Sequence, residues 1–265
     1  APSIFRQYGS DVKTLGINPN GYNINRLVGS TYPSALQKAV VELSADVGIA
    51  FDGDGDRVVM VDRKGGLLDG DDLLFVIANH YFRSGRLNGG VVGTQMSNLG
   101  LEQAIRGRGI GFERTRIGDR FVMERLEEKN WILGGESSGH IICRNIGVSG
   151  DGIVGAIQVL ESMANEKASL DDLTKGIKKV PQALVNVTVE DKKAVLNSMD
   201  LSEAISNAED LMNDRGRILI RASGTESLIR VMVEGYDIDW IEALSSDLSE
   251  KIKKIDRGLN SKNKF

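Results

Sequence analysis

Three aspartates alternate with glycines in the hexapeptide Asp52-Gly53-Asp54-Gly55-Asp56-Arg57. The glycines let the backbone curl, so that all three carboxylates can point at one spot. Two carboxylates about 4–5 Å apart repel each other by about 3–4 kcal/mol at an effective dielectric near ~20. Three converging carboxylates therefore need a cation, and an oxygen-only donor set favours Mg²⁺ or a similar hard ion over zinc or copper. The hexapeptide predicts a site for one metal ion held by Asp52, Asp54 and Asp56.

Two other interpretations of this aspartate loop are weaker. A solvated turn between strands would splay the carboxylates into water, but such a turn rarely needs three aspartates in alternation. A calcium loop of the EF-hand type fails on spacing. If Asp52 takes the first position, Arg57 stands where the invariant glycine belongs and Arg63 where the bidentate glutamate belongs.

A second candidate site is the segment Gly134-Gly135-Glu136-Ser137-Ser138-Gly139-His140. A carboxylate with a neighbouring hydroxyl can accept and donate hydrogen bonds to adjacent hydroxyls of a sugar. Glu136 and Ser138 are the candidate residues for that contact. Taken alone, an ordinary polar turn explains the segment equally well.

The third candidate is the segment Arg221-Ala222-Ser223-Gly224-Thr225-Glu226-Ser227, with Arg230 just beyond it. Hydroxyls and the N–H groups of a turn can surround an anion, and an arginine adds a two-pronged donor that suits phosphate. It is not a Walker loop, because the G-x-x-x-x-G-K-[ST] spacing is absent. We interpret it as a phosphate-binding loop, with a Ser/Thr-rich hairpin as the alternative.

The elements that must position these segments follow an α/β order, because apolar runs alternate with helical periodicity along most of the chain. Strands are predicted at 47–51, 58–61, 91–94, 111–114, 132–133 and 141–143, and helices at 71–82, at 101–108, from 119 and at 151–163. Each of the first two candidate loops then lies between two strands. The alternation predicts a doubly wound sheet domain in the middle of the chain.

The order of elements changes beyond the lysine-rich stretch Lys175–Lys179, which Pro181 closes and which we interpret as a hinge region. Strands are predicted at 183–189, 217–221 and 228–234, and helices around 201–212 and from 238. In the last helix five apolar residues follow helical spacing and are expected in the core: Ile241, Leu244, Leu248, Ile252 and Ile255. This part predicts a small α+β domain.

Composition limits the class of protein. A length of 265 residues allows two or three domains, and a net charge of -4 argues against general nucleic-acid binding. The chain has two histidines, too few for a multi-histidine zinc site. No apolar run is long enough to cross a bilayer, and no signal peptide opens the sequence. The one cysteine, Cys143, is expected in the core and fits a reducing cytoplasm.

Taken together and in this order, the three candidate loops resemble those of the α-D-phosphohexomutase family. Two further segments, Met96-Ser97-Asn98-Leu99-Gly100 and Gly118-Asp119-Arg120, add to the resemblance, which covers residues 1–255. It implies doubly wound mixed-sheet domains of the phosphohexomutase type followed by a small α+β domain. Residues 1–66 would be part of the family's second domain and carry the metal loop, 67–182 its third domain with the sugar-binding loop, and 183–265 its fourth, phosphate-binding domain.

The resemblance also implies roles for the candidate residues. Asp52, Asp54 and Asp56 would hold Mg²⁺, one ion per chain, and Arg57 would bind the transferring phosphoryl group. Glu136 and Ser138 would hold sugar hydroxyls, while Arg116 and Asp119 would line the cleft. The residues expected to hold the phosphate that does not react are Arg221, Ser223, Gly224, Thr225 and Arg230.

Some positions depart from the family pattern. Ala222 and Ser227 stand where proline is usual, and Ser137 stands where glutamine or methionine is usual; none of the three changes is expected to abolish function. The family's N-terminal domain, with its catalytic serine in a Thr-Ala-Ser-His-Asn-like loop, has no counterpart in the sequence. We therefore expect a truncated form that is inactive by itself. Gln95-Met96-Ser97-Asn98 resembles the serine loop superficially but matches a third-domain segment, so Ser97 is not the expected nucleophile.

The implied activity is the conversion of glucosamine 6-phosphate to glucosamine 1-phosphate, which supplies nucleotide-sugar and cell-wall synthesis in bacteria. A phosphoserine and a hexose 1,6-bisphosphate would be the intermediates, and the bisphosphate would also be the activator. Mutases of mannose or glucose phosphate are the nearest alternative, and a non-catalytic sugar-phosphate or Mg²⁺-binding protein is an alternative of another class. The expected partner is a phosphorylated hexosamine, with no nucleic acid and no membrane, and with a homodimer or self-association as a further possibility.

Overall fold

The structure is a computed structural model that describes residues 1–213, 215–224 and 226–262. The chain divides into two compact units, Ala1–Lys178 and Lys179–Phe265, each described by itself. The division falls within the lysine-rich stretch that the sequence suggested as a hinge. The domain boundaries drawn from the resemblance stay predictions. Within the described residues, no helix combines the length and the apolar character needed to cross a membrane.

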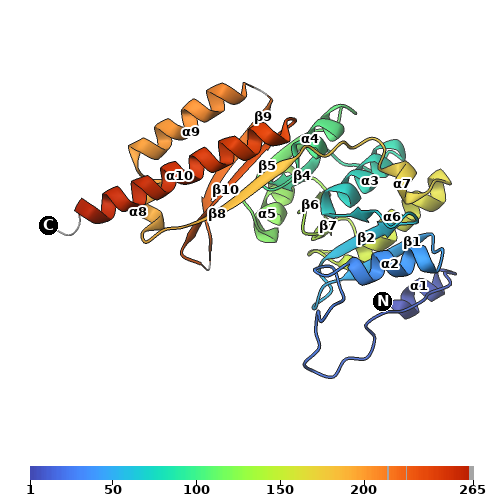
Figure 1. Ribbon diagram of the computed structural model, residues 1–265. Coiled ribbons are helices and arrows are strands. Elements are labelled where there is room, and N and C mark those ends of the chain that lie inside the picture. The colour runs from blue at the N-terminus through green and yellow to red at the C-terminus, as the bar shows by residue number, and fades with distance from the viewer. Residues whose placement is uncertain (214, 225, 263–265) are drawn as a thin grey trace. The chain divides into compact units, whose positions relative to one another are not determined.

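The first unit begins with two short helices and a small antiparallel sheet (Figure 1). Its elements are α1 (Pro2–Gln7), α2 (Ser34–Glu42), β1 (Val47–Phe51), β2 (Val58–Asp62) and β3 (Leu67–Leu68). β2 lies between β1 and β3, and Phe51 pairs with Val58 at the end of the first hairpin. The two strands predicted around the aspartate loop are confirmed, and the loop itself is the connection of this hairpin.

The rest of the first unit is built on a four-stranded mixed sheet. Its elements are α3 (Gly70–Arg83), β4 (Val91–Thr94), α4 (Leu99–Arg106), β5 (Phe112–Thr115), α5 (Asp119–Lys129), β6 (Leu133–Gly135), β7 (Ile141–Cys143), α6 (Gly152–Glu166) and α7 (Leu170–Leu173). The strand order is β5-β4-β6-β7. β4 runs parallel to β5 and β6, whereas β7 runs antiparallel to β6.

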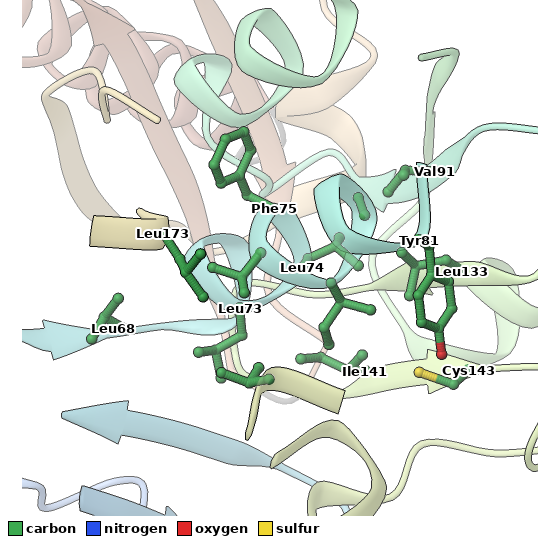
Figure 2. Close-up of a cluster of buried hydrophobic side chains, with 14 of the residues drawn as sticks. Leu68, Leu73, Leu74, Phe75, Tyr81, Val91, Leu133, Ile141, Cys143 and Leu173 are labelled. Carbon is green, nitrogen blue, oxygen red and sulfur yellow. The ribbon is translucent and has the colours of Figure 1, made fainter. Parts of the chain in front are cut away.

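Helices cover both faces of this sheet, as the doubly wound prediction requires. Because side chains alternate along a strand, Val91 packs into the large core that contains α3, whereas its neighbour Val92 packs against Val122 of α5. Figure 2 shows apolar side chains of α3 gathered with Val91, Leu133 and others above the sheet. Full burial of a valine, leucine or isoleucine side chain stabilises the fold by roughly 1.5–3 kcal/mol. The strands β1 and β2 contribute to the same core.

Several predicted boundaries in this unit differ from the observed ones by one to three residues, and two of them illustrate the cause. The helix expected at 101–108 is α4, which begins at Leu99, because the side chain of Asn98 accepts a hydrogen bond from the Gly100 N–H at 2.9 Å and caps the helix. The strand expected at 132–133 runs instead from Leu133 to Gly135.

The second unit is an antiparallel three-stranded sheet covered by helices. Its elements are β8 (Gln182–Thr188), α8 (Lys192–Leu196), α9 (Met199–Met212), β9 (Gly216–Ala222), β10 (Leu228–Gly235) and α10 (Ile238–Lys262), with strand order β8-β10-β9. Figure 1 shows α10 running along this sheet, beside α9. The apolar stripe predicted for the last helix is confirmed: Ile241, Leu248 and Ile252 are buried, and Leu244 and Ile255 pack against them.

Candidate functional site

The aspartate loop is ordered by its own first carboxylate. Asp52 Oδ1 accepts hydrogen bonds from the N–H groups of Gly55, at 3.1 Å, and Arg57, at 3.2 Å. These bonds curl the backbone between the two strands. As a result, one ligand atom from each of Asp52, Asp54 and Asp56 lies within 4.8 Å of the others. The structure therefore brings the three predicted metal ligands together.

The charges and donors of this loop fit a hard divalent cation. Oδ1 of Asp56 is buried and has no hydrogen-bond partner among the described residues. Nε of Arg57 lies 3.8 Å from carboxylate oxygens of both Asp52 and Asp56, so one partly exposed cation approaches two of the three carboxylates. An ion between the aspartates would give the Asp56 oxygen a partner and balance the remaining charge.

The aspartate loop is anchored to the start of α6. The N–H of Gly152 donates to the Gly55 carbonyl at 2.9 Å. A Cβ added at Gly152 would lie 2.8 Å from the Arg57 carbonyl oxygen and 2.9 Å from that of Gly55. Contacts this short do not occur between a Cβ and backbone oxygens, so the close approach requires glycine at this position.

His140 joins the aspartate loop to two other segments, and the sequence analysis missed this role. Its Nδ1 lies 3.0 Å from Oδ2 of Asp56, and its Nε2 lies 3.9 Å from Oδ2 of Asp119. The residue is 5% exposed, and among the described residues its Nε2 is buried without a hydrogen-bond partner, so the contact that fixes the ring is the one with Asp56. Its position directly after the Glu136–Gly139 segment was the available signal.

The turn before His140 is fixed by backbone geometry. Gly139 has φ +95°, and a Cβ there would lie 2.1 Å from the Val58 carbonyl oxygen. The Gly139 carbonyl in turn accepts a hydrogen bond from the Val58 N–H at 3.0 Å. Only glycine satisfies both conditions, and it places the second candidate loop directly beside the start of β2.

Glu136 is held by the segment that precedes α5. Its Oε1 accepts a hydrogen bond from the N–H of Gly118 at 2.9 Å. The carbonyl of Ser137 accepts from the N–H of Gly70 at 3.0 Å, while Ser138 is exposed. The backbone of the loop is therefore fixed, while the carboxylate of Glu136 is partly exposed and Ser138 is exposed. Both side chains are accessible to a sugar.

The two weaker candidates lie next to this loop. Asp119 is the first residue of α5 and is exposed apart from its approach to His140. Arg116 is exposed, with its guanidinium 4.2 Å from the centre of the Phe121 ring. The structure thus places Asp119 beside the metal loop, whereas the contact it gives Arg116 is with an aromatic ring.

Ser97, which resembles a catalytic serine in its local sequence, is fully buried at 0% exposure. Its Oγ accepts a hydrogen bond from the Thr94 N–H at 3.1 Å. Arg114 holds the same turn by donating to the Ser97 carbonyl. A hydroxyl engaged in this way supports the interpretation that Ser97 is structural.

The phosphate-loop candidate of the second unit connects β9 and β10, the two strands predicted on either side of it. Ser223 N–H donates to the Leu228 carbonyl at 2.9 Å. Arg221 and Arg230 are directly opposite each other across the two strands. Like charges in this position destabilise a sheet, and an anion between the two guanidinium groups would remove the repulsion.

The surroundings of the two arginines support an anion site. Burial, with a smaller effect of Arg230, lowers the pKa of Arg221 from its ordinary value. Within the described part of the chain Arg221 pairs with no carboxylate, and Nε of Arg230 is buried without a hydrogen-bond partner. Arg230 does lie 3.2 Å from the Glu226 carboxylate. At least one guanidinium is therefore available for a phosphate.

The remaining residues of the phosphate loop have different environments. Ser223 is 3% exposed, and its Oγ lies 3.3 Å from the Glu226 N–H that donates to it. Gly224 has open space where a Cβ would stand, and it is not among the residues with positive φ. Thr225, also predicted to bind phosphate, lies outside the described residues. The fold itself thus gives no reason for glycine at 224, whereas close approach of a ligand would.

Comparisons with known proteins match two parts of this chain to one family. A family model described as phosphoglucomutase/phosphomannomutase, alpha/beta/alpha domain III matches residues 69–180, and the C-terminal domain of the same family matches 184–251. Phosphoglucosamine mutase of Marinomonas sp. (strain MWYL1) is 50% identical over 255 residues, which are 96% of this chain and 57% of that protein. The Marinobacter nauticus protein of the same name is 50% identical over 254 residues, again 96% of this chain and 57% of its own length.

Solved structures show the same fold at low sequence identity. N-acetylphosphoglucosamine mutase of Aspergillus fumigatus, in complex with GlcNAc-6P and magnesium, has a TM-score of 0.75 and 20% identity over 89% of this chain and 55% of its own. A phosphoglucomutase/phosphomannomutase family protein of Burkholderia thailandensis has a TM-score of 0.77 and 20% identity over 96% of this chain and 57% of its own. The chain thus spans little more than half the length of these relatives. With two domains matched in order and half of all residues identical to curated members, the chain belongs to the phosphoglucomutase/phosphomannomutase, or α-D-phosphohexomutase, family.

Proposed function

We propose that this chain is the metal- and substrate-binding part of a phosphoglucosamine mutase, which interconverts glucosamine 6-phosphate and glucosamine 1-phosphate. The observation that carries the proposal is the meeting of three segments in the first unit. The aspartate loop, the Glu136–His140 loop and the Gly118–Asp119 turn lie together: Glu136 accepts from the Gly118 N–H, and His140 lies 3.0 Å from Asp56 and 3.9 Å from Asp119. The relatives at 50% identity carry the name of that activity.

The proposed reaction is a phosphoryl exchange through a serine supplied outside this sequence. The phosphoserine gives its phosphoryl group to a free hydroxyl of the hexose monophosphate. The resulting 1,6-bisphosphate reorients and returns its other phosphoryl group to the serine, so phosphate is conserved. When bound by the three aspartates, Mg²⁺ would neutralise charge on the transferring phosphoryl group.

This chain's own residues would bind and orient the substrate. Arg57, held beside Asp52 and Asp56 and still partly exposed, would contact the phosphoryl group that moves. Glu136 and Ser138 would hold sugar hydroxyls, and Glu136 would also attract the ammonium group of glucosamine. In the second unit, the arginines of the phosphate loop would hold the phosphate that does not react, which orients the sugar.

Glucose or mannose phosphate is the competing substrate class. The matched family model is described by those two sugars, and the Glu-x-Ser-Gly pattern of residues 136–139 is common to related mutases, so it does not discriminate. The preference for glucosamine phosphate rests on the identity to the named relatives.

Calorimetry on the 265-residue chain tests the proposed metal site. Asp54 is the residue to change, because it is exposed and makes no hydrogen bond among the described residues. Asp54→Asn should weaken Mg²⁺ binding by at least about 10-fold, since one of three charged ligands is lost. Asp46→Asn, which makes the same charge change at an exposed position of the same unit, is the matched control. Equal Mg²⁺ affinity in both variants would remove the aspartate loop from the proposed site.

A further inference from the structure

We propose that Lys192 is a positioning residue of the phosphate loop, which turns the N–H groups of that loop toward the bound phosphate. The inference rests on the phosphate-binding role proposed above for residues 221–230. It concerns a residue that precedes the loop by about 30 positions and has no place in the loop's sequence pattern.

The contact is made by the side chain at the start of α8. Nζ of Lys192 donates hydrogen bonds to the carbonyl of Ser223 at 2.8 Å and to the carbonyl of Glu226 at 2.7 Å. The helix start is itself fixed, because Asp191 accepts from the N–H groups of Lys193 and Ala194, each at 2.9 Å. One ammonium group therefore clamps both ends of the turn that joins β9 to β10.

Because the peptide bond is planar, fixing these two carbonyl groups also fixes the directions of the N–H groups that follow them. In a trans peptide the C=O and the following N–H point in opposite directions. Because the Ser223 carbonyl points at Lys192, the N–H of Gly224 points away from it, and the same holds for the Glu226 carbonyl and the N–H of Ser227. Among the described residues neither N–H finds an acceptor. Both N–H groups therefore face the side of the turn away from Lys192, where a bound anion would accept hydrogen bonds from them.

Two further observations favour an anion beside this turn. A Cβ at Gly224 would meet nothing within 4 Å, so there is free space beside this residue. The opposed pair Arg221 and Arg230 belongs to the strands that this turn connects. Lys192 would therefore act on the phosphate through the loop, since two of its three ammonium donors bond to carbonyls of the loop.

The experiment compares two lysines of one helix. Lys192→Met removes the clamp, Lys192→Arg keeps a cation with several donors, and Lys193→Met makes the same charge change at an exposed neighbour that has no side-chain contact among the described residues. Each 265-residue variant is titrated with glucosamine 6-phosphate and followed by the backbone amide NMR signals of Gly224 and Ser227. Deuterium exchange of the segment 216–230 is measured without ligand, because a residue acting only on the bound phosphate would not change it.

Lys192→Met should weaken glucosamine 6-phosphate binding by about 10-fold, as the loss of charge-assisted hydrogen bonds that hold a binding group typically does, and should speed exchange in the loop of the free chain. Lys193→Met should stay within about 2-fold of the parent, and Lys192→Arg should recover most of the affinity. Equal effects of the two methionine variants, or unchanged exchange in Lys192→Met, would overturn the inference. If Arg221→Ala leaves binding unchanged, the phosphate loop itself is wrongly assigned; if only Lys192→Met is without effect, the positioning role alone fails.

Discussion

Nδ1 of His140 lies 3.0 Å from Oδ2 of Asp56, although the two residues are 84 positions apart in the sequence. A hydrogen bond of this kind fixes the direction of a carboxylate that binds a metal. His140→Ala should therefore weaken Mg²⁺ binding to the chain by about 10-fold, the lower end of what such supporting contacts contribute. Calorimetry with Mg²⁺ measures it, and His80→Ala, which changes the other buried histidine away from the aspartates, is the control. Unchanged Mg²⁺ affinity in His140→Ala would contradict the role.

Gly224→Ala should weaken ligand binding while leaving the stability of the fold almost unchanged. Its Cβ would enter open space, and its φ is not positive, so the free energy of unfolding should change by less than about 1 kcal/mol. A methyl group beside the bound phosphate should nevertheless weaken glucosamine 6-phosphate binding severalfold. Denaturant unfolding and ligand titration of the same variant test both halves. A variant that binds normally would show that the ligand does not approach the loop at this glycine.

Arg217 should be needed for the stability of the second unit. Its Nε pairs with the carboxylate of Glu234, which is 0% exposed and also accepts a hydrogen bond from the Gln182 side chain at 2.8 Å. Arg217→Met removes this cation from a buried carboxylate and should lower the free energy of unfolding by about 3–5 kcal/mol. Adding Glu234→Leu should restore much of the loss, since the buried charge is then gone. Urea unfolding of both variants checks this, and a loss under 1 kcal/mol for Arg217→Met would contradict it.

The thiol of Cys143 should react only slowly with thiol reagents in the folded chain. Burial raises the pKa of its thiol to about 11, against a weaker opposing effect of a hydrogen bond with Tyr81, and Figure 2 shows the Tyr81 hydroxyl near this side chain. Because the folded pKa is raised, the contribution of the neutral thiol to stability is complete below the unfolded pKa of about 8.5. It is lost as the pH rises through about 11.

The measurement is the rate of thiol modification at pH 8 with a disulfide reagent. The folded chain should react at least about 100-fold more slowly than the urea-unfolded chain, because both thiolate fraction and access are lower. Equal rates would show that Cys143 is exposed, contrary to its 2% exposure.

The sequence predicted the elements whose pattern is local. The strands on each side of the aspartate loop and of the phosphate loop are apolar runs bounded by glycine or polar residues, so their type is clear without the fold. The apolar residues of α10 recur at helical spacing over about four turns, so this pattern is also clear from the local sequence alone. By contrast, α2 was not predicted: only Val40 of its nine residues is buried, and no side chain caps its start.

The part of the site that could not be predicted depends on contacts between distant segments. Sequence spacing placed the three aspartates together, because they share one loop. It did not show that His140 contacts Asp56 or that the Gly118 N–H holds Glu136, since both contacts need the sheet to bring separate loops to one place. The hydrogen bond from Lys192 to the Ser223 carbonyl is a further example, because the two residues are 31 positions apart.

Phosphorus NMR of hexose phosphate interconversion tests the central claim most directly. The 265-residue chain alone should not interconvert glucosamine phosphates, because no segment of its sequence resembles the family's catalytic serine loop, which stores the phosphoryl group. A chimaera in which this chain replaces the matched part of the Marinomonas protein should do so with Mg²⁺ and a trace of the 1,6-bisphosphate. Its kcat/KM should be highest for glucosamine 6-phosphate among the glucosamine, glucose and mannose phosphates. A folded chimaera that prefers mannose or glucose phosphate, or that turns over none of the three, would contradict the proposed function.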